Sequence, residues 1–163
     1  MNANFLKYFA VSFVLLLTFT LANSQEKNKG VEKVQDDMKV LKGDWICKKQ
    51  QWNGGPEDNV ESVKTMNKRL NFDKSVMIAK WIGGAGNLKH FEGKFDLDPT
   101  TIPKQFDFTG KDIKDPKGKD LVWRGIYELS QNEFKLMIVE NGKRPSDLKS
   151  QIGIYMLFKR DIE

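Results

Sequence analysis

The sequence predicts an all-β protein, an antiparallel up-and-down barrel of eight strands preceded by one short helix. Apolar and polar residues alternate in about eight short segments, which is the pattern of strands with one buried and one solvated face. Turn-forming residues separate several segments by only two to five positions, as in hairpins between antiparallel neighbours. Helical segments do not alternate with the strands, so the pattern does not fit a parallel α/β sheet. Eight strands are enough to close a barrel that is either packed or holds one small ligand.

The predicted helix comes first in the barrel domain. Val31, Val34, Met38 and Leu41 recur at spacings of three and four residues, and Gly43 ends this pattern. We expect the eight strands, in chain order, at 45–50, 68–72, 75–81, 88–97, 105–109, 121–129, 133–139 and 153–159. We expect surface loops at 53–59, 82–87 and 110–120, and a helical turn within 144–150 that begins near Pro145.

The N-terminal 24 residues predict a secretory signal peptide. Lys7 is their only charge, an almost wholly apolar run follows at 9–21, and Ala22-Asn23-Ser24 provides a small-x-small cleavage site. The apolar run is shorter than the ~20 residues that cross a bilayer comfortably, so a retained anchor is the secondary interpretation. We therefore expect export to the periplasm or outside the cell, a flexible segment at 25–30, and one barrel domain at 31–163.

The charge balance argues against a nucleic-acid partner. The 163 residues carry a formal charge of +5, and because only Lys7 lies in the signal segment, 26 basic and 22 acidic residues remain without it, a charge of +4. Both signs are interleaved, as in the run 111–119, where lysine alternates with aspartate. Nucleic-acid sites cluster basic residues without interleaved acids. We also expect no stable membrane anchor after signal cleavage.

No pattern in the sequence predicts catalysis, a cofactor or a metal. The single Cys47 and single His90 exclude a disulfide framework and a Cys-based zinc site. Cys47 is expected to be a buried, inert thiol. A general base needs a partner, and no local motif links His90 to a conceivable one such as Asp96. The glycine-rich segment 83–86 lacks the following helix of a phosphate loop.

Several motifs resemble those of an uncharacterised lipocalin-like (calycin-type) family of secreted domains abundant in planctomycete bacteria. The matching segments are LKGDW at 41–45, GKFDLDPTTIPKQFDFT at 93–109, GIYEL at 125–129, FKL at 134–136, RPSDLKS at 144–150 and LFKR at 157–160. The resemblance extends over nearly all of 41–160 and implies a lipocalin-like barrel and export. It implies no known activity. The Thr-Asp-x-x-x-Tyr motif and paired cysteines of classical lipocalins are absent.

The resemblance also implies a contact at one end of the barrel. In lipocalins a basic residue at the end of the last strand packs over the Trp of a Gly-x-Trp motif. Gly43 and Trp45 form that motif here, and Arg160, or alternatively Lys159, is placed to cover the indole. A guanidinium on an indole face contributes about 0.5–2 kcal/mol, so we expect these residues to stabilise the closed barrel.

Aromatic side chains are the candidate ligand-binding residues. They could line a cavity for a small hydrophobic molecule, or they could simply fill the barrel interior. The candidates are Trp45, Phe72, Trp81, Phe95, Phe106, Phe108, Trp123, Tyr127 and Tyr155. The first interpretation makes the protein a ligand-binding module. The second makes it a structural or protein-interaction domain that acts through its surface loops, and the sequence leaves both open.

Overall fold

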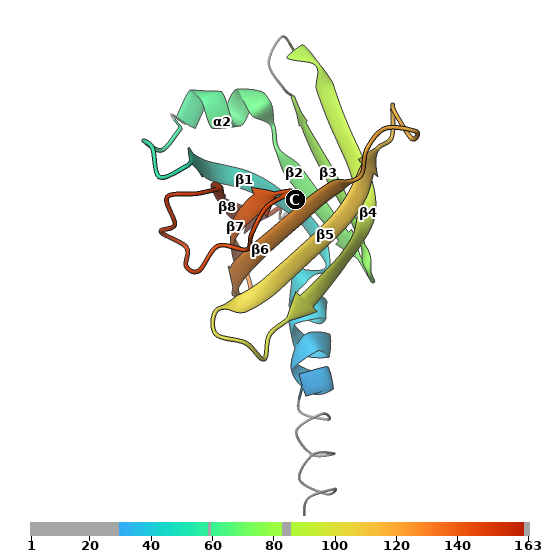
Figure 1. Ribbon diagram of the computed structural model, residues 1–163, viewed down its shortest axis with the longest axis vertical. Coiled ribbons are helices and arrows are strands. Elements are labelled where there is room, and N and C mark those ends of the chain that lie inside the picture. The colour runs from blue at the N-terminus through green and yellow to red at the C-terminus, as the bar shows by residue number, and fades with distance from the viewer. Residues whose placement is uncertain (1–29, 59, 83–85, 162–163) are drawn as a thin grey trace, which may run out of the picture.

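The strand order along the chain is also the strand order around the barrel (Figure 1). In the computed structural model every strand pairs antiparallel with the next, and β1 pairs with β8 to close the barrel. The structure describes residues 30–58, 60–82 and 86–161, so the predicted signal peptide and residues 25–29 of the predicted flexible segment lie outside the described residues. The strands are β1 Gly43–Trp52, β2 Arg69–Asp73, β3 Val76–Ile82, β4 Leu88–Asp98, β5 Lys104–Asp112, β6 Leu121–Leu129, β7 Glu133–Glu140 and β8 Ile154–Arg160.

The predicted fold class is confirmed, since the barrel is all-antiparallel, eight-stranded and closed. All eight strands lie where the alternation of residues predicts them, within about three residues at each end. The predicted helix extends from 30 to 41 and ends before Gly43. Gly43 has a φ of 109°, which residues other than glycine rarely adopt.

Two helices lie at opposite ends of the barrel (Figure 1). The helix at 30–41 leads into β1 at what we call the closed end, and the short helix α2, Val60–Met66, lies at the other end, the mouth. Helix α2 was not predicted from the sequence. Seven residues form fewer than two helical turns, so its stability comes from contacts such as that of the buried Val63. Within the described part of the chain, no helix is long and apolar enough to cross a membrane.

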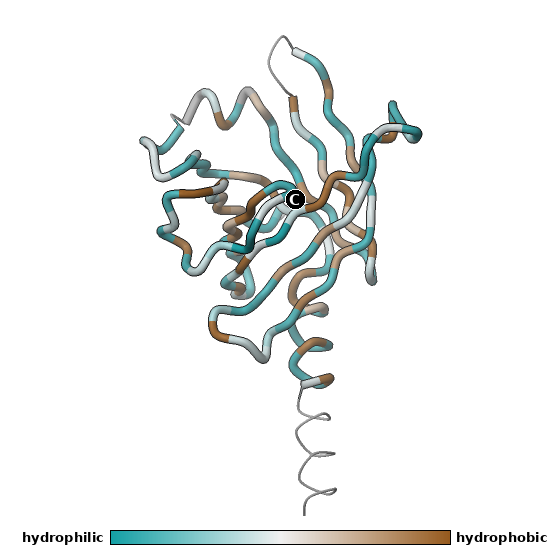
Figure 2. The backbone as a smooth tube through the Cα atoms, in the orientation of Figure 1, coloured by the Kyte–Doolittle hydropathy of each residue, from teal (hydrophilic) through white to brown (hydrophobic). Residues whose placement is uncertain are grey.

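Alternating side chains fill the barrel interior. Along the strands the tube in Figure 2 changes repeatedly between hydrophobic and hydrophilic residues, and the inward-facing residues form the core. In β1 a bulge between Cys47 and Lys49 shifts the alternation by one position. Gln50 is therefore buried while Lys49 is exposed, although an unbroken alternation from Trp45 would point Lys49 inward.

The long connection between β7 and β8 folds back over the outside of the barrel. Arg144 fixes this loop, because its Nη2 donates to both carboxylate oxygens of Asp107 at 2.9 and 2.8 Å and its Nη1 donates to the carbonyl of Gly125 at 2.6 Å. Pro145 is buried beneath the loop. The segment 144–150 contains bends and a turn in place of the expected helical turn, and the backbone N–H of Lys149 donates to Asp147 Oδ1 there at 2.7 Å.

Candidate functional site

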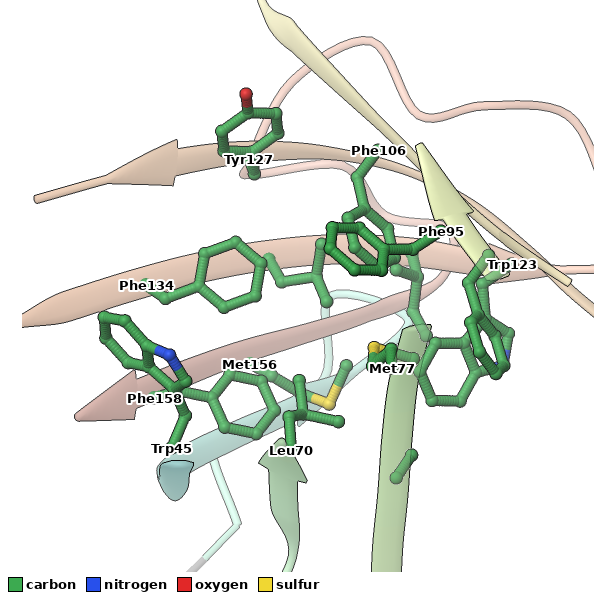
Figure 3. Close-up of a cluster of buried hydrophobic side chains, with 14 of the residues drawn as sticks. Trp45, Leu70, Met77, Phe95, Phe106, Trp123, Tyr127, Phe134, Met156 and Phe158 are labelled. Carbon is green, nitrogen blue, oxygen red and sulfur yellow. The ribbon is translucent and has the colours of Figure 1, made fainter. Parts of the chain in front are cut away.

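Most of the predicted ligand-binding aromatics pack against one another in the barrel interior. Phe134 lies at the centre of this cluster, with its ring 5.8 to 6.3 Å from five other aromatic rings (Figure 3). The candidates in this packed set are each at most 3% exposed: Trp45, Phe72, Phe95, Phe106, Phe108 and Tyr127. Rings at these separations gain both buried area and edge-to-face attraction, so the closed half of the barrel is a solid core.

Toward the mouth the interior is less tightly filled. There a cavity of about 220 Å³ opens between β1, β2, β3, β6, β7, β8 and α2. Trp81 and Trp123 are the predicted aromatics that line it, with ring centroids 6.3 Å apart. The full lining, which we call the mouth cavity, is Trp52, Met66, Lys68, Trp81, Trp123, Ile138, Glu140, Ile154 and Met156. Known small-molecule sites span about 300–1,000 Å³, so this cavity suits a small ligand or one end of a longer one.

Tyr155 lies on the outer face of the barrel, contrary to its predicted place among the interior residues. Met156 and Phe158 on the same strand face inward. Successive side chains of a strand point to opposite faces, so Tyr155 between Ile154 and Met156 points outward. Tyr155 lines a hollow of about 500 Å³ between the outside of the sheet and the loop residues Lys149 and Gln151. A second outer hollow, of about 470 Å³, lies between the N-terminal helix and the β4–β5 connection.

A buried lysine distinguishes the mouth cavity from both outer hollows. Lys68 is only 8% exposed, and its ammonium group donates to Gln50 Oε1 and, at 3.7 Å, to Met156 Sδ. The same Nζ lies 5.3 Å from the ring centroid of Trp81 and 5.9 Å from that of Trp52. The two indole faces stabilise a positive charge there.

Burial shifts the pKa values of both titratable groups at the base of the cavity. It lowers the pKa of Lys68 below its ordinary value, an effect that the negative charges of ionised Cys47 and Asp58 oppose. Burial raises the pKa of Cys47 to about 11. Cys47 is therefore a protonated thiol near neutral pH, and its Sγ donates to the carbonyl of Lys49 at 3.2 Å.

The predicted closing residues meet at the opposite end. The Arg160 guanidinium lies 4.4 Å above the centre of the Trp45 ring, and its Nη1 donates to the carbonyl of Lys42 at 2.8 Å. Trp45 Nε1 donates to the carbonyl of Leu41 at 2.7 Å. A Cβ on Gly43 would lie 3.5 Å from the guanidinium, an ordinary contact distance, so the positive φ and not crowding favours glycine here. Lys159 instead pairs with Glu133 on the barrel surface.

His90 and the acidic side chains were the remaining candidates for chemistry within the described part of the chain. His90 lies on β4 opposite Lys80, and its buried Nε2 has no hydrogen-bond partner within the described residues. Burial and the Lys80 charge lower its pKa. Across residues 30–58, 60–82 and 86–161, no group of three His, Cys, Asp or Glu side chains is placed to hold a metal ion.

Sequence reasoning missed Lys68 in the cavity lining and its buried hydrogen-bond partner Gln50. Lys68 has the same parity as Leu70 and Phe72, both of which face inward, so the alternation in β2 already points Lys68 toward the interior. Gln50 had no such signal, because the bulge in β1 places it inward.

No family model matches the sequence, and no curated protein does, so membership of the family that the motifs resemble stays a prediction. Among solved structures, a lipocalin-like protein from Bacteroides uniformis ATCC 8492 is 16% identical, with a TM-score of 0.47, covering 75% of this chain and 99% of its own. An uncharacterized protein from Bacteroides eggerthii DSM 20697 is 14% identical, with a TM-score of 0.44, covering 74% of this chain and 99% of its own.

Proposed function

We propose that this chain is a binding module that holds a small, mostly apolar molecule in the mouth cavity. The observation that carries this proposal is the lining of the cavity, which combines three of the four tryptophans of the chain with one buried ammonium group. Concave, aromatic-lined sites with a few convergent polar groups are typical of ligand-binding sites. The packed closed half limits the ligand to the mouth, so a long chain would have to extend out into solvent.

We propose a non-enzymatic role, which the residues facing the cavity support. Lys68 and Glu140 are its only ionisable lining residues among those described, and neither has a second titratable group within hydrogen-bond distance in that part of the chain. Nucleophilic or general-base catalysis needs such a paired partner.

The solid core favours one alternative, a protein-interaction domain that acts through its loops. The connections at 53–59, 82–87 and 110–120 all join strands at the mouth end, although residues 59 and 83–85 lie outside the described part. The alternative thus uses the same end of the barrel and differs in whether the cavity is occupied.

Export is part of the proposal and rests on the signal-like sequence at 1–24. So does membership of the uncharacterised secreted family that the motifs resemble. In an exporting host, the purified protein should have the intact mass of a chain that begins at Gln25. The mass of the full 163 residues would contradict cleavage.

Native mass spectrometry tests the binding role. The protein from an exporting host is compared under native and denaturing conditions, before and after incubation with 1-octanol as an apolar probe. We expect an added mass that leaves on denaturation. The variant Ile154→Phe, which fills the cavity, should lose the adduct, whereas the matched Ile152→Phe change at an exposed loop position should keep it. A bare mass throughout, or an adduct unaffected by Ile154→Phe, would favour the loop-interaction alternative.

A further inference from the structure

The charge on Lys68 has only neutral hydrogen-bond acceptors in the described part of the chain. They are the amide oxygen of Gln50 and the thioether of Met156, which is a weak acceptor. Buried lysines are ordinarily paired with a negative group, because removing an unpaired charge from water is costly. An ammonium group also has three N–H donors, and a sulfur atom satisfies one of them poorly. The site is therefore short of one good acceptor.

The carboxylate of Asp58 attracts the Lys68 charge and is hydrogen-bonded to it through an intervening amide. Gln50 Nε2 donates to Asp58 Oδ2 at 2.8 Å, while Gln50 Oε1 accepts from Lys68. This relay holds the Gln50 side chain with its oxygen toward the ammonium group. The relay therefore orients the Gln50 side chain, while the Asp58 carboxylate is not among the residues that line the cavity.

The cavity side of the ammonium group is apolar. The indoles of Trp52 and Trp81 flank Nζ, and Ile154 and Met156 complete the nearby wall. Water is a poor partner in such surroundings, whereas a ligand with an apolar body and one anionic end would satisfy both parts of the site.

We propose that Lys68 makes the mouth cavity selective for apolar molecules that carry one carboxylate, an inference that rests on the proposed binding function. The carboxylate accepts from Nζ between the two indoles, and the apolar body covers Trp123 and Ile138 on its way toward solvent. Charge-assisted hydrogen bonds are about twice as strong as neutral ones, so the acid is preferred over an alcohol with the same body.

Glu140 is the one described group in the lining that opposes this selectivity. It lies at the end of β7 and is exposed, so solvent screens its charge more than that of the buried Lys68. If Glu140 dominated, the cavity would prefer a cationic end. The probes must therefore include all three charge types on one body.

A matched series of headgroups on one tail tests the inference. Octanoate, 1-octanol and octylammonium are titrated against the protein at pH 7, with tryptophan fluorescence and calorimetry as readouts. We expect octanoate to bind about ten- to a hundredfold more tightly than octanol, as a charged hydrogen bond in place of a neutral one implies. Octylammonium should bind most weakly. Glu140→Gln should strengthen octanoate binding slightly and leave the order unchanged.

The variant Lys68→Met keeps the length of the side chain and removes its charge. It should abolish the preference for octanoate and retain octanol binding, while the matched change Lys80→Met on the exposed face of β3 should alter neither. If Lys68→Met does not fold, the pH dependence of the unaltered protein decides. Octanoate affinity should fall as the pH rises through the pKa of Lys68 in the complex, because the deprotonated amine no longer attracts the anion, and octanol affinity should stay level.

The failures of the two proposals are distinguishable. Equal affinity for octanoate and octanol, or tighter binding of octylammonium, would overturn the role of Lys68 and leave a binding module. Failure of all three probes to bind at millimolar concentration would overturn the binding function and the selectivity together.

Discussion

Removing the Arg160 guanidinium should weaken the closed end of the barrel by an amount that the structure lets us estimate. The group lies 4.4 Å over the Trp45 ring, which contributes about 0.5–2 kcal/mol. It also donates through Nη1 to Lys42, through Nε at 3.0 Å to Gln131, and through Nη2 to the carbonyl of Val40. Solvent reaches part of this site, so each bond adds about 0.5–1 kcal/mol.

Arg160→Ala should therefore lower the free energy of unfolding by about 3 kcal/mol. Arg160→Lys keeps the charge and loses the planar fork of donors, so about half of that loss should remain. Arg124→Ala, at an exposed position of β6, is the control and should change stability by less than about 0.5 kcal/mol.

A double-mutant cycle isolates the contact between the Arg160 guanidinium and the Trp45 indole. Arg160→Ala and Trp45→Phe are combined, and urea unfolding is followed by far-ultraviolet circular dichroism, which does not depend on tryptophan. We expect a coupling energy of about 1 kcal/mol between the two changes. Losses that add to within about 0.3 kcal/mol would refute the stabilising role of the stacked guanidinium and leave only its hydrogen bonds.

Three further outcomes follow from the core, the outer loop and the buried thiol. Phe134→Leu should cost about 1.5–3 kcal/mol in urea unfolding, because Phe134 contacts five aromatic rings, and a smaller cost would mean that the closed half is loosely packed. Arg144→Gln should speed amide hydrogen exchange within the β7–β8 loop while the barrel strands keep their protection, and Asp107→Asn should give a milder version of the same effect. Burial raises the pKa of the Cys47 thiol from 9.0 to about 11. The protonated thiol therefore stabilises the folded protein fully below pH 9, and this contribution is lost as the pH rises to 11. Relative to Cys47→Ala, the unaltered protein should therefore lose an extra 2–3 kcal/mol, roughly, over that interval, and parallel curves would contradict the burial of the thiol.

Strands could be predicted because their local pattern and the fold agree. In β6, for example, Leu121, Trp123 and Tyr127 alternate with outward residues, and both boundaries were predicted correctly. The helix α2 escaped prediction because seven residues have little intrinsic helical stability, and packing over the mouth determines their conformation.

The candidate site was predictable only in part. Trp81 and Trp123 lie in the cavity as the ligand-binding hypothesis requires, whereas Phe106 and Phe108 are equally aromatic and fully packed. Phe108 is the cross-strand partner of Trp123, with ring centroids 5.1 Å apart, so the two groups differ in the side chains that surround each ring. Those neighbours depend on how the strands are staggered around the barrel, which a linear pattern does not contain. The inward position of Gln50 was also unpredictable, because the bulge after Cys47 adds one residue and so exchanges the inward-facing and outward-facing positions of β1.

The last strand has a consequence for the order in which the barrel assembles. β8 pairs with both β7 and β1, and the bond from Arg160 to Lys42 joins positions 118 residues apart. Such distant partners raise the contact order, so folding should be slow for a domain of this size, and closure should be its final step. A growing or truncated chain that lacks β8 exposes the edges of two strands at once. Edges of this kind recruit other chains, so the seven residues of β8 protect the protein from aggregation as well as completing its wall.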